Sequence, residues 1–118
     1  MAVFEQRIAV KGPRQDDWEE ISALVDTGST YTVVPTPLLR RLGVAPAERR
    51  RFRIADNSVI ERDIGEVMVR VDGRIRTTVV VFGGEEGPNL LGAVTLEEFG
   101  LGVDPVNKRL IPVEGYLL

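Results

Sequence analysis

Short runs of apolar and β-branched residues, separated by polar turns, make up most of the chain and predict a protein built mainly of β-strands. Ile21, Ala23 and Val25 fall on alternate positions of one run, so we expect them on the same side of a sheet. The predicted strands are residues 3–10, 18–25, 30–34, 51–55, 59–61, 67–71 and 75–82, with late edge strands at 110–111 and 116–118.

Two polar turns predict β-hairpins. Asp72-Gly73 is the strongest short hairpin signal in the sequence, because both residue types tolerate the left-handed backbone of a tight turn. Asp56-Asn57-Ser58 separates two predicted strands, and side chains of these types favour turns by bonding to nearby backbone N–H groups.

Helices are predicted at only two places, residues 36–43 and 95–100. In the first, Thr36 suits the cap, Pro37 the first helical position and Gly43 the position after the end. The second spans only one or two turns.

These two segments share a pattern. Residues 39–44 and 96–101 both read apolar-x-x-apolar-Gly-apolar, and each follows two aliphatic residues and a glycine turn: Leu24-Val25 with Gly28, and Leu90-Leu91 with Gly92. Short apolar patterns also recur by chance. We interpret this one as a weak internal duplication in which only the first half carries an aspartate.

Composition limits the chemistry more than the fold. The 118 residues suffice for one domain, and 43% hydrophobic content is ordinary for a globular protein. The chain has no cysteine and no histidine, which excludes disulfides, Ser-His triads and nearly every zinc site. Acid-base chemistry is left to carboxylates, lysine, tyrosine and hydroxyls, and we predict neither a metal nor a cofactor.

Charge and hydropathy give no reason to expect nucleic-acid or membrane partners. The net charge is −3, and no stretch approaches the roughly 20 apolar residues that cross a bilayer. The basic run at residues 49–53 is interpreted as a solvated strand edge, with nucleic-acid contact as the weaker alternative. The first residues lack the pattern of a secretory signal, so a cytoplasmic protein is expected.

Asp26 is the residue that needs an explanation. It follows the apolar pair Leu24-Val25 and precedes Thr27-Gly28, so a carboxylate ends a strand that is expected to be buried. An unpaired charge in such a place is costly. An isolated Asp-x-Gly is usually no more than a turn, so the rest of the chain must decide.

The stretch LVDTGSTYTVVP resembles the active-site motif of the aspartic peptidases, apolar-apolar-Asp-Thr-Gly-Ser followed by Val34-Pro35. Leu90-Leu91-Gly92-Ala93 resembles their second motif, the apolar-apolar-Gly segment beside the catalytic loop, and residues 103–112 resemble the end of single-domain, retroviral-type members. The resemblance implies a single retropepsin-like domain over residues 1–118: mostly β, a closed barrel-like acid-protease fold with one or two short helices and one lobe per chain.

The resemblance also implies roles for particular residues. Asp26 would be catalytic, supported by Thr27, Gly28 and Ser29, with Leu90, Leu91 and Gly92 beside that loop. Gly28 lets the backbone turn tightly, and Thr27 can hydrogen-bond to a neighbouring loop. The hairpin tip would be a flap that binds substrate, formed by Ile54, Ala55, Asp56, Asn57 and Ser58. Its tip lacks the glycines of viral flaps.

A catalytic pair requires a second aspartate, and no other aspartate is followed by Thr-Gly or Ser-Gly. The partner of Asp26 must then be Asp26 of another copy, as a two-fold dimer places a residue opposite itself. The terminal strands, 3–10 and 110–118, are candidates for the dimer sheet, although they could equally be core strands of a monomer.

The sequence therefore predicts a homodimeric aspartic endopeptidase that cleaves peptides or proteins. The main alternative is a peptide-binding or dimerisation module that keeps the fold without turnover, which the glycine-free flap and the lack of an obvious pro-segment leave open. A small nucleic-acid-binding barrel is a third reading, and it rests on the arginine run alone.

Overall fold

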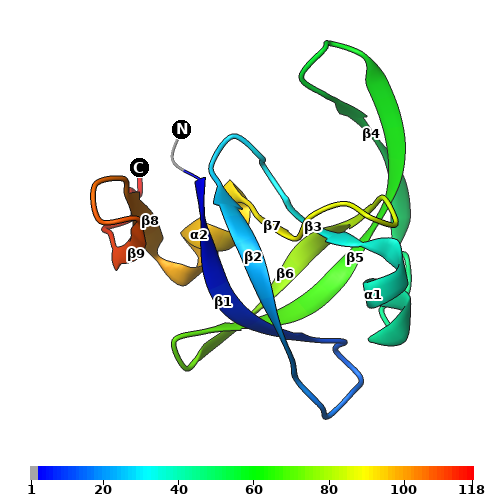
Figure 1. Cartoon of the computed structure of the whole chain (residues 1–118), viewed down its shortest axis with the longest axis horizontal. Helices are drawn as coiled ribbons and strands as arrows, with labels where there is room; N and C mark the ends of the chain where they lie inside the picture. The colour runs from blue at the N-terminus through cyan, green and yellow to red at the C-terminus, as the bar shows by residue number, and fades with distance from the viewer. Residues whose placement is uncertain (1–2) are drawn as a thin grey trace.

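The computed structural model describes residues 3–118 and confirms a chain that is mostly β (Figure 1). The elements are β1 (Val3–Lys11), β2 (Glu19–Asp26), β3 (Thr32–Pro35), α1 (Thr36–Arg41), β4 (Glu48–Arg53), β5 (Val59–Val71), β6 (Arg74–Gly83), β7 (Leu90–Leu91), α2 (Ala93–Phe99), β8 (Leu101–Asp104) and β9 (Arg109–Pro112). In this described part of the chain, no helix has the length and apolar character needed to span a membrane.

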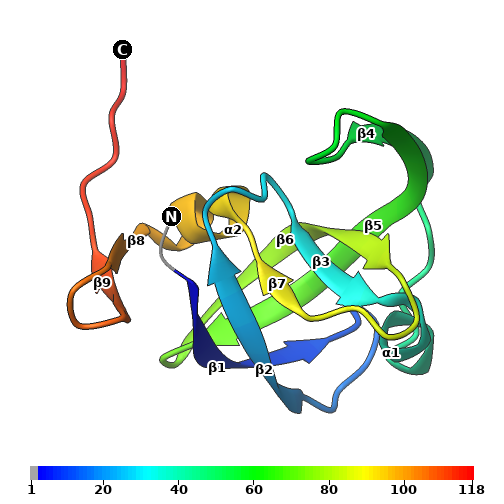
Figure 2. The ribbon, with the colours of Figure 1, turned by 45° about the horizontal axis from the view of Figure 1, so that its top comes forward.

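The main sheet curls into a barrel-like shape. Its strand order is β1-β2-β7-β3-β6-β5-β4, and β1 also pairs with β5. That additional pairing runs from Ala9 to Lys11 and brings the first strand of the order back against the sixth. The hairpin of β4 and β5 extends beyond the barrel (Figure 2), and β8 and β9 form a separate two-stranded sheet.

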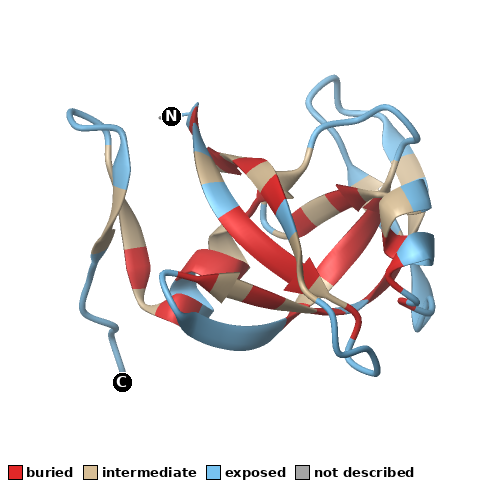
Figure 3. Ribbon diagram, turned by 60° about the horizontal axis from the view of Figure 1, so that its bottom comes forward, coloured by how far each residue is buried: buried red, intermediate tan, exposed pale blue. Residues whose placement is uncertain are grey.

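The core fills the inside of this barrel. Val67, Val69 and Val71 alternate along β5 and are at most 1% exposed, as the period of a strand with one buried face requires. Both helices add to the core, α1 through Leu39 and α2 through Leu96 and Phe99, as the buried stretches in Figure 3 show.

The predicted hairpins are confirmed, and β5 is longer than expected. Asp72 and Gly73 both have positive φ, 49° and 81°, in the turn between β5 and β6. The two strands predicted at 59–61 and 67–71 are one continuous strand, because residues 59–64 pair with β4 and residues 64–71 with β6.

Both predicted helices form, but Thr36 is not the cap of α1. Pro35 occupies the cap position without a side-chain hydrogen bond, and Thr36 is the first helical residue. The Thr36 hydroxyl instead donates to the Gly83 carbonyl at 2.7 Å, which joins α1 to β6. Helix α2 begins at Ala93, earlier than predicted, and ends at Phe99, with Gly100 as its C-cap at φ 67°.

The strand predicted at residues 116–118 is wrong. These residues have no regular structure, and their side chains are almost wholly exposed on a tail that runs away from the barrel (Figure 2). The predicted strand at 110–111 is confirmed within β9, where Leu110 pairs with Val103 of β8.

Candidate active site

Asp26 ends β2 and begins a tight turn. Strand β2 pairs with β1 on one side and with β7 on the other, so Val25 is fully buried while Asp26 is only partly buried. The Gly28 N–H donates to Asp26 Oδ1 at 2.9 Å, and the Ser29 N–H donates to the Asp26 carbonyl at 3.1 Å. These bonds turn the chain away from the core and leave the other carboxylate oxygen, Oδ2, for a ligand.

The two segments interpreted as a duplication lie side by side. Strands β2 and β7 pair in parallel, with Leu24 opposite Leu90 and Val25 opposite Leu91. Just beyond this pairing, the N–H groups of Ala93 and Val94 donate to the carbonyls of Ser29 and Thr30, each at 2.9 Å. The start of α2 thus holds the loop that follows Asp26.

Gly92 stands where the two segments come closest. A Cβ atom at this position would lie 2.4 Å from the Tyr31 carbonyl carbon and 2.9 Å from the Ser29 carbonyl oxygen. Both neighbours are backbone atoms, which cannot rotate aside as a side chain could. Only glycine fits, and the reason is the close backbone approach rather than an unusual φ.

A chain of buried hydroxyl groups lies behind the loop. The Gly92 N–H donates to Thr32 Oγ1 at 3.1 Å, Thr32 and Thr95 hydroxyls are 2.6 Å apart, and those of Thr95 and Thr78 are 2.9 Å apart. Thr78 donates to Glu98 Oε1 at 2.6 Å. Because a carboxylate only accepts, each hydroxyl donates to the next one in the direction of Glu98.

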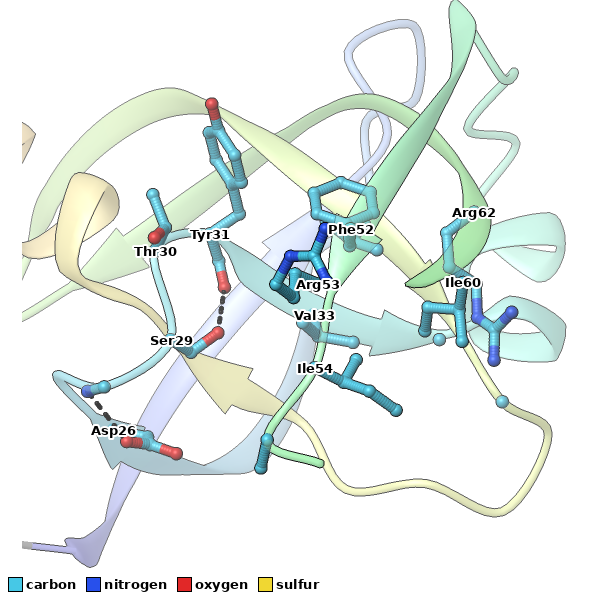
Figure 4. Close-up of a pocket in the computed structure, with 15 residues that line it drawn as sticks. Asp26, Ser29, Thr30, Tyr31, Val33, Phe52, Arg53, Ile54, Ile60 and Arg62 are labelled. Atoms are coloured by element: carbon cyan, nitrogen blue, oxygen red, sulfur yellow. Dashed lines mark hydrogen bonds between the residues drawn. The ribbon is translucent and has the colours of Figure 1, made fainter. Parts of the chain in front are cut away.

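A cavity of about 630 Å³ opens between Asp26 and the β4–β5 hairpin (Figure 4). Its wall includes the apolar side chains of Val33, Phe52, Ile54 and Ile60. Asp26 is the only carboxylate that lines it within the described residues. The cavity can therefore hold an extended chain with apolar side chains beside one acidic group.

The hairpin predicted to be a flap borders the same cavity. Ile54 and Ala55 line it, whereas Asp56, Asn57 and Ser58 form the exposed tip. Asp56 Oδ1 accepts from the Ser58 hydroxyl and from the Ser58 N–H at 2.9 Å, and these two bonds hold the pKa of the Asp56 carboxyl below its ordinary 3.8. Asn57 has φ 71°, a conformation that asparagine tolerates.

Tyr31 connects the Asp26 loop to β4, the strand that leads to the flap. Its ring meets the Phe52 ring edge to face at 6.2 Å, and its hydroxyl accepts a hydrogen bond of 3.1 Å from Arg50. None of these three residues was predicted to belong to the site. The signal that could have found them is the alternation of Arg50 and Phe52 on one face of β4.

The other predicted site residues divide into three groups. Gly28 and Ser29 line the cavity with Asp26. Leu90, Leu91 and Gly92 support the loop from behind, with Leu91 fully buried. Thr27 is exposed and does not line the cavity. The arginine run belongs to β4 at the edge of the sheet, where Arg49 contacts Glu61 and Asp63, as expected of a solvated edge.

Comparisons with known proteins agree with this geometry. The sequence profile of the aspartyl protease family matches residues 9–95. The fold is similar to the solution structure of the simian foamy virus protease, with a TM-score of 0.59 and 19% identity over 81% of this chain and 94% of that one. No curated protein matches the sequence.

Two further solved structures are similar. The EIAV protease in complex with the inhibitor HBY-793 has a TM-score of 0.55 and 19% identity, covering 83% of this chain and 88% of that one. A protein of unknown function from Legionella pneumophila has a TM-score of 0.57 and 16% identity, covering 95% of this chain and 96% of that one. At such identities the likeness concerns the fold, and the predicted fold is confirmed.

Replacing Gly92 with alanine is expected to lower the free energy of unfolding by about 2 kcal/mol or more, because the added methyl group meets fixed backbone atoms. Urea unfolding measures the change. Gly84→Ala is the matched control, since a Cβ there has nothing within 4 Å, and it should stay within about 0.5 kcal/mol of the parent. Equal stability of the two variants would contradict the close approach.

Replacing Thr95 with valine is expected to cost about 1–3 kcal/mol of stability, because the buried Thr32 hydroxyl loses its acceptor and Thr78 loses a donor. Thr77→Val, an exposed change on β6, serves as the control. Thermal or urea unfolding of both variants tests the chain of hydroxyl groups, and an unaffected Thr95→Val protein would argue against it.

The flap turn is expected to weaken in acid. Because the folded pKa of Asp56 is lowered, its stabilising effect is complete above 3.8 and is lost as the pH falls through the folded pKa. In an NMR titration, Ser58→Ala should move the Asp56 pKa up toward 3.8 while the lowered pKa of Asp104, held by Asn107, stays unchanged. An unchanged Asp56 pKa would mean that the Ser58 hydroxyl is not the donor that lowers it.

Proposed function

Because this chain belongs to the aspartyl protease family, we propose that it is an aspartic endopeptidase that works as a homodimer. The catalytic pair would be the Asp26 side chains of two copies. The observation that carries the proposal is the position of Asp26, which the turn to Gly28 directs into a cavity with no other carboxylate among the described residues.

Two carboxylates about 3 Å apart cannot both ionise, so they hold one proton between them. The ionised Asp26 removes a proton from water, whose oxygen attacks the scissile carbonyl carbon. The protonated Asp26 of the second copy gives its proton to the carbonyl oxygen. In the second half, the pair returns a proton to the leaving nitrogen as the C–N bond breaks and recovers its own proton from the diol.

The residues around Asp26 suit this role. The hydrogen bond from the Gly28 N–H to Oδ1 fixes the orientation of the Asp26 carboxylate. The loop is held at Ser29 and Thr30 by the start of α2, so the carboxylate keeps its position while a proton moves. An extended peptide would lie between this loop and Ile54 and Ala55 of the flap.

Several exposed groups near the ends of the chain support a dimer. Val3, which pairs with Asp26 across β1 and β2, is 50% exposed. Val113 is 47% exposed, and the tail beyond it ends in the exposed apolar residues Tyr116, Leu117 and Leu118. A dimer interface at this end of the molecule would remove such apolar groups from water. Thr27 is also exposed beside Asp26, where it could bond to the same loop of a second copy.

Asp26→Asn is expected to reduce kcat/KM on a fluorogenic peptide library by at least about 10³-fold, because it removes a proton-transfer group. Asp72→Asn is the control, since it neutralises an aspartate in the β5–β6 turn, where asparagine also suits the positive φ. Cleavage that survives Asp26→Asn would rule out the mechanism. A folded dimer that cleaves nothing would favour the binding-module alternative.

Mixing parent and Asp26→Asn protein separates a two-chain pair from a one-chain site. After the subunits exchange, activity should fall as the square of the parent fraction, because mixed dimers hold only one aspartate. A linear fall would contradict the shared pair. Sedimentation at the same concentrations gives the dimer population, and a monomer that cleaves would be an equally direct contradiction.

A further inference from the structure

Two arginine side chains line the cavity described above, in addition to its apolar residues. Arg53 and Arg62 both line the cavity, and they come from the paired strands β4 and β5 (Figure 4). Arg62 lies next to Ile60 and well away from Asp26. The cavity thus combines an acidic end with a wall that is partly cationic.

The guanidinium groups along this hairpin differ in their partners. Within residues 3–118, Arg49 forms ion pairs with Glu61 and Asp63, and Arg50 with Glu48, whereas Arg62 forms no ion pair, as is also true of Arg51 and Arg53. Its single hydrogen bond runs from one terminal nitrogen to the Glu61 carbonyl at 2.9 Å. The remaining N–H groups of Arg62 are available to a ligand.

The surroundings of Arg62 favour a carboxylate as that ligand. Arg62 is partly buried beside an apolar wall, where a charge-assisted hydrogen bond is stronger than in open water. Its cross-strand neighbour is Arg50, a cation that is itself paired with Glu48 and so offers Arg62 no carboxylate. A planar guanidinium binds a carboxylate through two parallel hydrogen bonds.

We propose that Arg62 is a specificity-determining residue that binds the carboxylate of a glutamate or aspartate side chain in the peptide held by this cleft. The proposal rests on the proposed function, because it takes the cavity to be the peptide site. In a two-fold dimer the cleft has an Arg62 at each end, so acidic side chains are preferred on both sides of the bond to be cut.

Binding measured without cleavage tests this proposal separately from the protease activity. The probes are labelled peptides with an apolar centre flanked by glutamate, and the same peptides with glutamine in place of glutamate. In Asp26→Asn protein, fluorescence anisotropy should give at least tenfold tighter binding of the glutamate peptide. The preference should shrink as salt is added, because screening weakens the attraction.

Variants of Arg62 supply the decisive comparison. Arg62→Gln should abolish the preference for glutamate, Arg62→Lys should retain part of it, and Arg62→Glu should favour a lysine peptide instead. Arg51→Gln is the matched control, since Arg51 is an exposed residue of the same hairpin that does not line the cavity. The control should keep the preference of the parent.

Each outcome tests the role of Arg62 separately from the protease activity. Equal binding of glutamate and glutamine peptides, or a preference that survives Arg62→Gln, overturns the role of Arg62 even if the protein cleaves peptides. A preference lost with Arg62 but not with Arg51 supports it even if the protein cleaves nothing.

Discussion

The close approach of Gly92 to the backbone of Ser29 and Tyr31 is the constraint on which the candidate site depends. Without a side chain at Gly92, β7 can pair in parallel with β2 and feed directly into α2, whose first N–H groups hold the loop that follows Asp26. The Thr32 hydroxyl accepts a hydrogen bond from the Gly92 N–H. From Thr32, a chain of hydrogen bonds runs through two more threonines to Glu98. One small residue therefore positions a loop, a helix start and a buried polar network together.

The cavity itself depends on a second connection, between segments far apart in the sequence. Strand β4 extends beyond the barrel, so its position relative to Asp26 is not fixed by the main sheet alone. Tyr31 supplies the missing contact, because it touches both Phe52 and Arg50 on the inner face of β4. The loop that carries Asp26 and the hairpin that faces it thus share an aromatic contact and a hydrogen bond.

The parts of the site that a local pattern specifies could be predicted from the sequence. The motif around Asp26, the Leu90-Leu91-Gly92 segment and the Asp56–Ser58 turn each depend on residues close together in the chain. The first two meet at the Asp26 loop, and the turn closes the hairpin whose Ile54 and Ala55 line the cavity. The family that the motifs suggested is also the family to which the chain belongs.

What escaped prediction depends on contacts between distant segments. Thr36 looked like a cap, but its hydroxyl donates to Gly83 at the end of the neighbouring strand β6, 47 positions further along the chain. Thr32, Thr78 and Thr95 are unremarkable in sequence, and only the fold brings their hydroxyls together in the core. The partners of the arginines could not be predicted either. Four arginines lie in β4 near Arg62, and their composition does not tell which of them form ion pairs within the protein.

In a site whose second aspartate comes from another copy of the chain, catalytic activity depends on dimer formation. Among residues 3–118, Asp26 is the one carboxylate that lines the cavity, so the proposed proton-sharing pair exists only at concentrations where two chains associate. In a two-fold dimer, every other residue that lines the cavity, including Arg62, is present twice. A peptide has no two-fold symmetry, so different side chains of the peptide contact the two copies of each residue. The binding energy of an acidic peptide would therefore act on two chains at once, stabilising the dimer in which the aspartates come together.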